Sequence, residues 1–83
     1  MERSTILDAV YDACVQVLDA DKASLTETTA FAADLEADSL ALVEIVMELE
    51  EAFDLQIPED ELEGVTTIGS AVDLVAHRLG ANA

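Results

Sequence analysis

Basic side chains are nearly missing from this sequence: three Lys and Arg stand against 19 Asp and Glu, giving a net charge of −16. The imbalance is sharpest between Ala23 and His77, where 14 acidic residues occur without any Lys or Arg. So acidic a surface repels nucleic acid and anionic membranes and attracts basic patches on other proteins. The charge therefore excludes nucleic acid and membrane partners and predicts protein partners with basic docking surfaces.

Cysteine is almost absent too, and long apolar runs are missing. Cys14 is the only cysteine, so an internal disulfide is excluded, and its place in an apolar helical pattern predicts a core residue. The N-terminal Met-Glu-Arg-Ser shows no apolar region of a secretory signal, and no apolar run approaches a membrane span. We therefore expect a cytoplasmic protein, and we expect it to be a monomer.

Strand-like alternation and internal repeats are also lacking, whereas apolar residues recur at helical spacing. The chain has 83 residues and 52% hydrophobic content, enough for one folded domain over residues 1–83. The fold class is predicted to be all-α: a small four-helix bundle, with three main helices, one short helix and a long first loop.

The helix ends are predicted from capping residues, and the core from the apolar stripes. The predicted elements are a helix capped by Ser4 or Thr5 and running to about Leu18, a helix after Asp38, a very short helix around Leu62, and a last helix from Thr66 or Thr67 to about Leu79, before a stop at Gly80. The first helix should bury Ile6, Leu7, Val10, Cys14, Val17 and Leu18, with Tyr11 beside them, and the last should bury Ile68, Ala71, Val72, Val75 and Leu79.

The predicted first loop, 19–37, shows no sustained period. Asp19 and Asp21 begin like a calcium-binding loop, but Ser24 occupies the position that requires Gly, so no metal site is predicted. Leu25, Phe31 and Leu35 are expected to hold the loop against the bundle. An ordered loop of this length is usually functional.

The stretch from Asp34 to Phe53 carries the candidate site. Asp38 is a good N-cap, which places Ser39 in the first turn of the helix beside free N–H groups and the positive end of the dipole. That position favours a phosphate group. Ser39 has no His or Lys nearby in sequence and the only histidine, His77, is predicted on an outer face, so Ser39 is expected to be an acceptor modified by another enzyme rather than a catalytic residue of this chain.

This helix has two apolar stripes. Leu42, Ile45, Val46, Leu49 and Phe53 form a core face, and Leu40, Val43 and Met47 form a second stripe, bordered by Glu44, Glu50 and Glu51. Either something docks on the second stripe, or both stripes are buried within the domain.

The tripeptide Asp38-Ser39-Leu40, followed by VEIVMELEEAF and by IPEDELEGVTTIGSAVDLV, resembles the acyl carrier proteins over about Thr26 to Val75. In that family the serine carries a 4′-phosphopantetheine arm whose thiol holds acyl groups as thioesters. The resemblance implies a carrier rather than an enzyme, with the arm on Ser39 beside Asp38. It also implies partners: a phosphopantetheinyl transferase, and acyltransferases, ligases, ketosynthases or tailoring enzymes, docking on Asp38, Leu40, Val43, Glu44, Met47, Glu50 and Glu51.

Three positions depart from the family pattern. Glu36 stands where the family usually has Gly, and Ala41 and Leu42 stand where acidic or polar residues often follow the tripeptide. We therefore predict a free-standing carrier of polyketide or other secondary metabolism. Leu42 is expected to close the core of the bundle, so that a short or polar cargo stays outside. The alternatives are a housekeeping fatty-acid carrier, an aminoacyl or peptidyl carrier, and an unmodified acidic interaction module, which needs the charge but not the serine.

Overall fold

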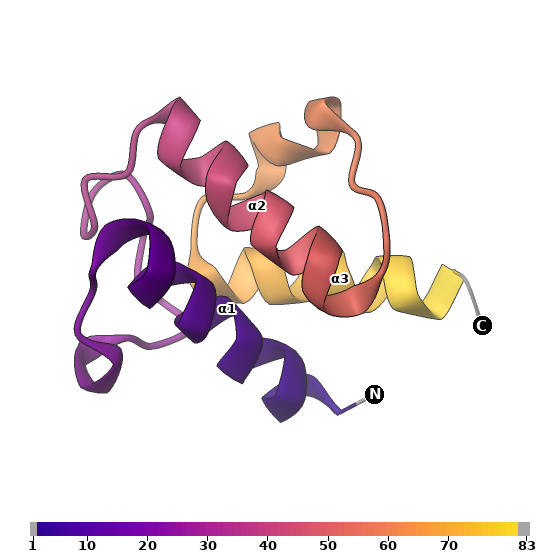
Figure 1. The fold of residues 1–83 in the computed structure, drawn as a ribbon, viewed down its shortest axis with the longest axis horizontal. Coiled ribbons are helices and arrows are strands. Elements are labelled where there is room, and N and C mark those ends of the chain that lie inside the picture. Colours follow the sequence, from indigo (N-terminus) through magenta and orange to yellow (C-terminus); the bar gives the residue numbers. More distant parts are fainter. Residues whose placement is uncertain (1, 82–83) are drawn as a thin grey trace.

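The computed structural model describes residues 2–81, and within them the chain is helical (Figure 1). The α-helices are α1 (Arg3–Leu18), α2 (Ser39–Phe53) and α3 (Ile68–Ala81), and two short 3₁₀ helices are η1 (Lys22–Ser24) and η2 (Glu59–Gly64). Helix α1 packs against both α2 and α3, while the long connection crosses one end of the bundle. The predicted all-α class, with three main helices and one short one, is confirmed; η1 was not predicted.

The core forms where the predicted apolar stripes of the three α-helices meet. Its buried residues are Ile6, Val10, Ala13 and Cys14 of α1, Ile45, Val46 and Leu49 of α2, and Ile68, Ala71, Val72 and Val75 of α3. Ala13 was not predicted. The outer members of the stripes, Leu7, Tyr11, Val17, Leu18, Phe53 and Leu79, are half-buried and pack against this core. Because the apolar stripes face inward, the acidic residues lie outside, and no charged side chain is buried within residues 2–81.

Two predicted helix ends are wrong. Helix α1 begins at Arg3 with Glu2 as an N-cap that makes no side-chain bond, so Ser4 and Thr5 lie inside the first turn and are exposed. Helix α3 continues through Gly80 to Ala81, and Gly80 has no positive φ. Glycine permits the left-handed turn that ends a helix but does not force it.

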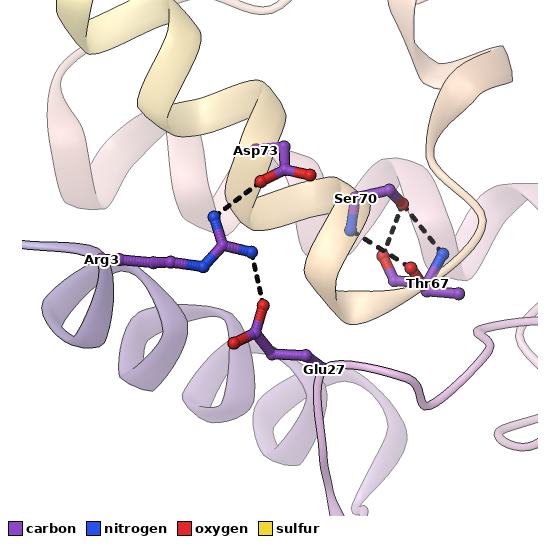
Figure 2. A network of polar contacts seen from close by, with 5 residues as sticks. All are labelled: Arg3, Glu27, Thr67, Ser70 and Asp73. Carbon is purple, nitrogen blue, oxygen red and sulfur yellow. Dashed lines mark hydrogen bonds and ion pairs between the residues drawn. The ribbon is translucent and has the colours of Figure 1, made fainter.

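The predicted cap of α3 is confirmed at Thr67. The hydroxyl of Thr67 accepts a hydrogen bond from the amide of Ser70 at 3.2 Å. The Ser70 hydroxyl in turn accepts from the amide of Thr67 at 2.9 Å, so each residue satisfies a free donor of the other. Figure 2 shows this reciprocal pair at the start of the helix.

The first loop is held against the bundle as predicted. Leu25 and Phe31 are buried and Leu35 is half-buried. A single antiparallel bridge between Ala30 and Thr67 adds a backbone anchor, because it ties the loop to the start of α3. The loop that leads to Ser39 is therefore fixed at its middle.

A second anchor of the loop involves Gly69, which the sequence did not single out. The Gly69 amide donates to the carbonyl oxygen of Glu27 at 2.8 Å, and a Cβ at Gly69 would come within 3.0 Å of that oxygen. Arg3 closes the same corner by pairing with the carboxylate of Glu27 and, at 2.6 Å, with that of Asp73 (Figure 2). One guanidinium thus joins α1, the first loop and α3.

The loop also contains a left-handed residue, Glu36, at φ 53°. This is the position where the carrier family usually has Gly. The left-handed region suits Gly and costs other residues roughly 1–2 kcal/mol. The chain therefore keeps a conformation suited to Gly without the glycine.

Replacing Glu36 with Gly should raise the free energy of unfolding by about 0.5–1 kcal/mol, since relief of the left-handed strain exceeds the added entropy of the unfolded chain. Urea unfolding followed by circular dichroism measures it. Glu36→Gln removes the charge alone, and Ala33→Gly tests glycine at a loop residue without positive φ. Equal stabilisation by Glu36→Gln would show that charge, not backbone strain, is the cause.

Candidate functional site

Ser39 is the first residue of α2, as predicted. A carboxylate oxygen of Asp38 accepts a hydrogen bond from the amide of Ala41 at 2.8 Å, which fixes the start of the helix. The Ser39 side chain is exposed, and no hydrogen bond within residues 2–81 uses its hydroxyl or the amides of Ser39 and Leu40. The site thus combines an accessible hydroxyl with free donors at the positive end of a helix.

Two hollows flank Ser39. The larger, of about 480 Å³, lies towards η2 and is lined by Ser39, Leu42, Val43, Glu59, Asp60, Leu62 and Glu63. The smaller, of about 330 Å³, lies towards the first loop and includes Phe31, Ala33, Ala37 and Val65 besides Ser39 and Leu42. The serine therefore stands between two partly apolar recesses.

Leu42 lines both hollows and is half-buried, packed against the core from its edge. Leu42 thus lies on the core face of α2 as predicted, but it is only half-buried there. It lies in the first turn of α2, which is less covered than the following turns that contain the buried Ile45 and Leu49. Leu42 therefore stands between the two recesses, at the edge of the core.

The second stripe of α2 faces outward. Leu40 is 67% exposed and Met47 is 55% exposed, while Val43 is half-buried. Glu44 and Glu51 beside it are also exposed. The alternative that both stripes are buried is wrong, and the helix carries an exposed apolar surface edged with carboxylates.

Glu50 has a role inside the chain that the sequence did not reveal. It is half-buried, and its carboxylate accepts a hydrogen bond from the amide of Ile57 at 2.8 Å. This bond fixes the connection after α2, where Ile57 itself is buried. The Glu50 carboxylate is therefore partly occupied, unlike those of Glu44 and Glu51.

The three cations of the sequence all lie in ion pairs away from this surface. Arg3 pairs with Glu27 and Asp73, Lys22 with Asp8 and Asp12, and Arg78 with Glu61 at 2.5 Å. The hydrogen bonds that the Lys22 ammonium donates to Asp12 and then to Asp8 hold the pKa of Lys22 above its usual range. The acidic face of α2 is therefore not neutralised by the chain's own Lys or Arg.

The remaining reactive groups are not arranged for catalysis. Burial raises the pKa of the Cys14 thiol to about 11, so it is neither ionised nor accessible at neutral pH. His77 is exposed on α3, as predicted. Within residues 2–81 no cluster of His, Cys, Asp and Glu is placed to bind a metal ion, and no helix there is long and apolar enough to cross a membrane.

The tertiary structure adds three acidic residues that the sequence analysis did not include in the site. Glu59, Asp60 and Glu63 of η2 line the larger hollow opposite Ser39. The acidic run after Pro58 was visible in the sequence, but its position across from Ser39 depends on the fold. These residues extend the acidic surface to both sides of the serine.

Residues 8–75 match the family model of the phosphopantetheine attachment site. The match defines the class: a small helical carrier that bears a phosphopantetheine arm. The chain is 46% identical over 77 residues to an acyl carrier protein of Picosynechococcus, covering 93% of this chain and 95% of that one. An acyl carrier protein of Rubrobacter xylanophilus is 47% identical over 77 residues, with the same coverage.

A solved structure leads to the same conclusion. An acyl carrier protein from Enterococcus faecalis superposes with a TM-score of 0.76 at 31% identity, covering 94% of this chain and 99% of that one. The chain belongs to the acyl carrier protein family. It is a carrier rather than an enzyme, and family membership implies a covalently attached 4′-phosphopantetheine.

Proposed function

We propose that Ser39 is the attachment residue and that the chain is a free-standing acyl carrier protein. The single observation that carries the proposal is the exposed Ser39 hydroxyl at the start of α2, beside amides that no other group of residues 2–81 uses. A phosphate ester on this oxygen would lie at the positive end of the helix, where a negative charge is stabilised. When bound, the arm supplies a thiol that holds acyl groups as thioesters.

The residues around Ser39 fit this role. Asp38 holds the helix start through its bond to Ala41, so the backbone of Ser39 is fixed in the first turn. Cys14 is buried, so the chain's own thiol does not compete with that of the arm.

Incubation with coenzyme A and a broad phosphopantetheinyl transferase should add the mass of one phosphopantetheine, whereas an unmodified acidic module would gain none.

The partners are a phosphopantetheinyl transferase and enzymes that load, extend or tailor the cargo, such as acyltransferases, ligases and ketosynthases. Leu40, Val43 and Met47 would form the apolar centre of their docking surface, with Glu44 and Glu51 meeting basic residues. Glu50 and Asp38 would contribute less, because their carboxylates already accept backbone hydrogen bonds.

For the pathway we propose polyketide or other secondary metabolism, supported by Ala41 and Leu42 in place of polar residues and by Glu36 in place of Gly. A housekeeping fatty-acid carrier is the second candidate, favoured by the identity of 46–47% to relatives named simply acyl carrier protein. The cargo experiment in the Discussion separates them, since an elongating fatty-acid carrier must accommodate long aliphatic chains. Aminoacyl cargo remains a further alternative, distinguished by the substrate that a cognate ligase attaches.

Reversing Glu44 and Glu51 to Lys should lower kcat/KM for transfer to partner enzymes by about tenfold, because each exposed carboxylate then repels a basic patch. Higher salt should also lower kcat/KM for the wild-type protein, because it screens the attraction between the carboxylates and the basic patch. Met47→Ala should also weaken it through lost apolar contact. Steady-state kinetics with the loading transferase measure all three effects.

Glu2→Lys is the control for charge alone, since Glu2 is exposed and lies before α1, outside the proposed docking surface. An unchanged kcat/KM in the Glu44→Lys, Glu51→Lys variant, with an intact circular dichroism spectrum, would show that partners dock elsewhere.

A further inference from the structure

The seam between α1 and α2 contains a surface hollow that brings Gln16, Val17 and Glu48, which the family resemblance did not assign, beside three of the residues that it did. The hollow has about 350 Å³ and is lined by Gln16 and Val17 of α1 and by Glu44, Met47, Glu48 and Glu51 of α2. A second hollow of about 190 Å³ also includes Gln16 and Glu48, with small side chains such as Ala9 and Ala52. We call the six residues of the first hollow the α1–α2 seam.

The seam carries negative charge without a cation. Within residues 2–81, no ion pair reaches Glu44, Glu48 or Glu51. Glu48 lies four residues after Glu44 and three before Glu51, spacings at which like charges repel along a helix. Lys22, which follows α1 in the chain, is already paired with Asp8 and Asp12 and so does not neutralise the seam. A positive group from another molecule would therefore relieve a repulsion that the chain leaves in place.

The seam is also partly apolar. Met47 is 55% exposed and Val17 is half-buried, and both line the hollow. A side chain that combines an aliphatic stem with a cationic head matches this combination, because the stem covers apolar surface while the head stays among carboxylates. Arginine fits better than lysine, since its planar guanidinium can bond to two carboxylates at once.

We propose that the docking surface for the phosphopantetheinyl transferase continues across the α1–α2 seam and that a transferase arginine occupies it. Its stem packs against Val17 and Met47, and its guanidinium pairs with Glu44 and Glu48. The proposal rests on the proposed function, which makes that transferase a partner. It adds α1 to a surface otherwise confined to α2.

The distance from Ser39 is compatible with this interface. Glu48 follows Ser39 by nine residues, which is about 14 Å along a helix axis. A standard interface covers about 800 Å² on each partner, equivalent to a disc about 16 Å in radius. A transferase centred on Ser39 therefore reaches the seam.

Substitutions on the two helices test the proposal, with the apo protein, coenzyme A and a broad transferase as the probe. Glu48→Lys should lower kcat/KM for loading and weaken the Kd of the transferase by about 5–10-fold. Gln16→Lys on α1 should lower kcat/KM and weaken the Kd by about 3–5-fold, and Gln16→Glu should improve both by about 2–3-fold. Loading is followed by intact mass and the Kd by titration.

Matched controls make the same charge changes away from the seam. Glu2→Lys matches Glu48→Lys, while Ser4→Lys and Ser4→Glu match the Gln16 variants on the same helix, about 18 Å along its axis. Each control should change kcat/KM less than about twofold. All these side chains are exposed, so the variants should fold, and the lysine introduced by Glu48→Lys can pair with Glu44 within the chain.

The outcomes separate the two proposals. No addition to the wild-type protein overturns the proposed function and this inference with it. If the wild-type protein is loaded but the Glu48 and Gln16 variants behave like their controls, the inference alone is overturned. Effects of Gln16→Lys and Gln16→Glu in opposite directions support it, because a merely structural role of Gln16 would not reverse with the sign of the charge.

Discussion

The Ser39→Ala variant is expected to keep its fold and to lose all addition of phosphopantetheine. The loss should be complete because, in the proposed function, the Ser39 hydroxyl oxygen forms the phosphate ester, and no neighbouring hydroxyl occupies the start of α2. The fold should persist because Ser39 is exposed and Asp38, not Ser39, caps the helix. Alanine is also a better helix former than serine.

Intact mass after incubation with coenzyme A and transferase measures the addition, and circular dichroism checks the fold. Ser4→Ala is the matched control, since Ser4 is an exposed serine in the first turn of α1. It should be loaded like the wild type. Addition that persists in Ser39→Ala, or its loss in Ser4→Ala, would place the attachment site elsewhere.

The Leu42→Ala variant is expected to open the recesses beside Ser39 to an aliphatic cargo. Leu42 lines both hollows, of about 480 and 330 Å³, so removing its side chain should join them. In the wild type a medium-length acyl chain should remain mostly outside, because entering past Leu42 would disturb close packing at a cost of roughly 1–3 kcal/mol. In the variant the chain should reach Val46 and Leu49.

The same substitution should lower the free energy of unfolding by about 1–2 kcal/mol. A buried leucine would lose about 2–5 kcal/mol on truncation, and Leu42 is only half-buried. Leu40→Ala is the matched control: Leu40 is 67% exposed in the same turn, so its truncation should change stability by about 0.5 kcal/mol or less. Urea unfolding measures both values.

Chemical shifts of Val46 and Leu49 and the rate of thioester hydrolysis measure where the chain lies after loading. Large shifts and slow hydrolysis in the wild type would contradict the closed core and favour the housekeeping fatty-acid role. Shifts that appear only in Leu42→Ala would support a short or polar cargo. Unchanged shifts in both proteins would show that Leu42 does not control access.

The sequence alone determined the parts of the site that depend on near neighbours along the chain. The cap by Asp38, the position of Ser39 and the existence of a second stripe with Leu40 and Met47 follow from capping and from helical period, both of which act within about four residues. Whether that stripe is exposed or buried was left open by the sequence and was decided by the fold. The anchoring of the loop by Leu25 and Phe31 was also predictable, because large apolar residues within a polar segment are usually buried.

Only the tertiary structure decided the contacts between distant residues. Arg3 meets Asp73 across 70 positions, and Gly69 approaches the Glu27 carbonyl so closely that a Cβ there would require the oxygen to shift. Glu36 adopts the left-handed conformation despite its Cβ, Glu50 turns inward to Ile57, and Leu42 lies between two hollows. The physical reason is common to all five: their geometry depends on how the helices pack against one another, and local propensity carries no information about that packing.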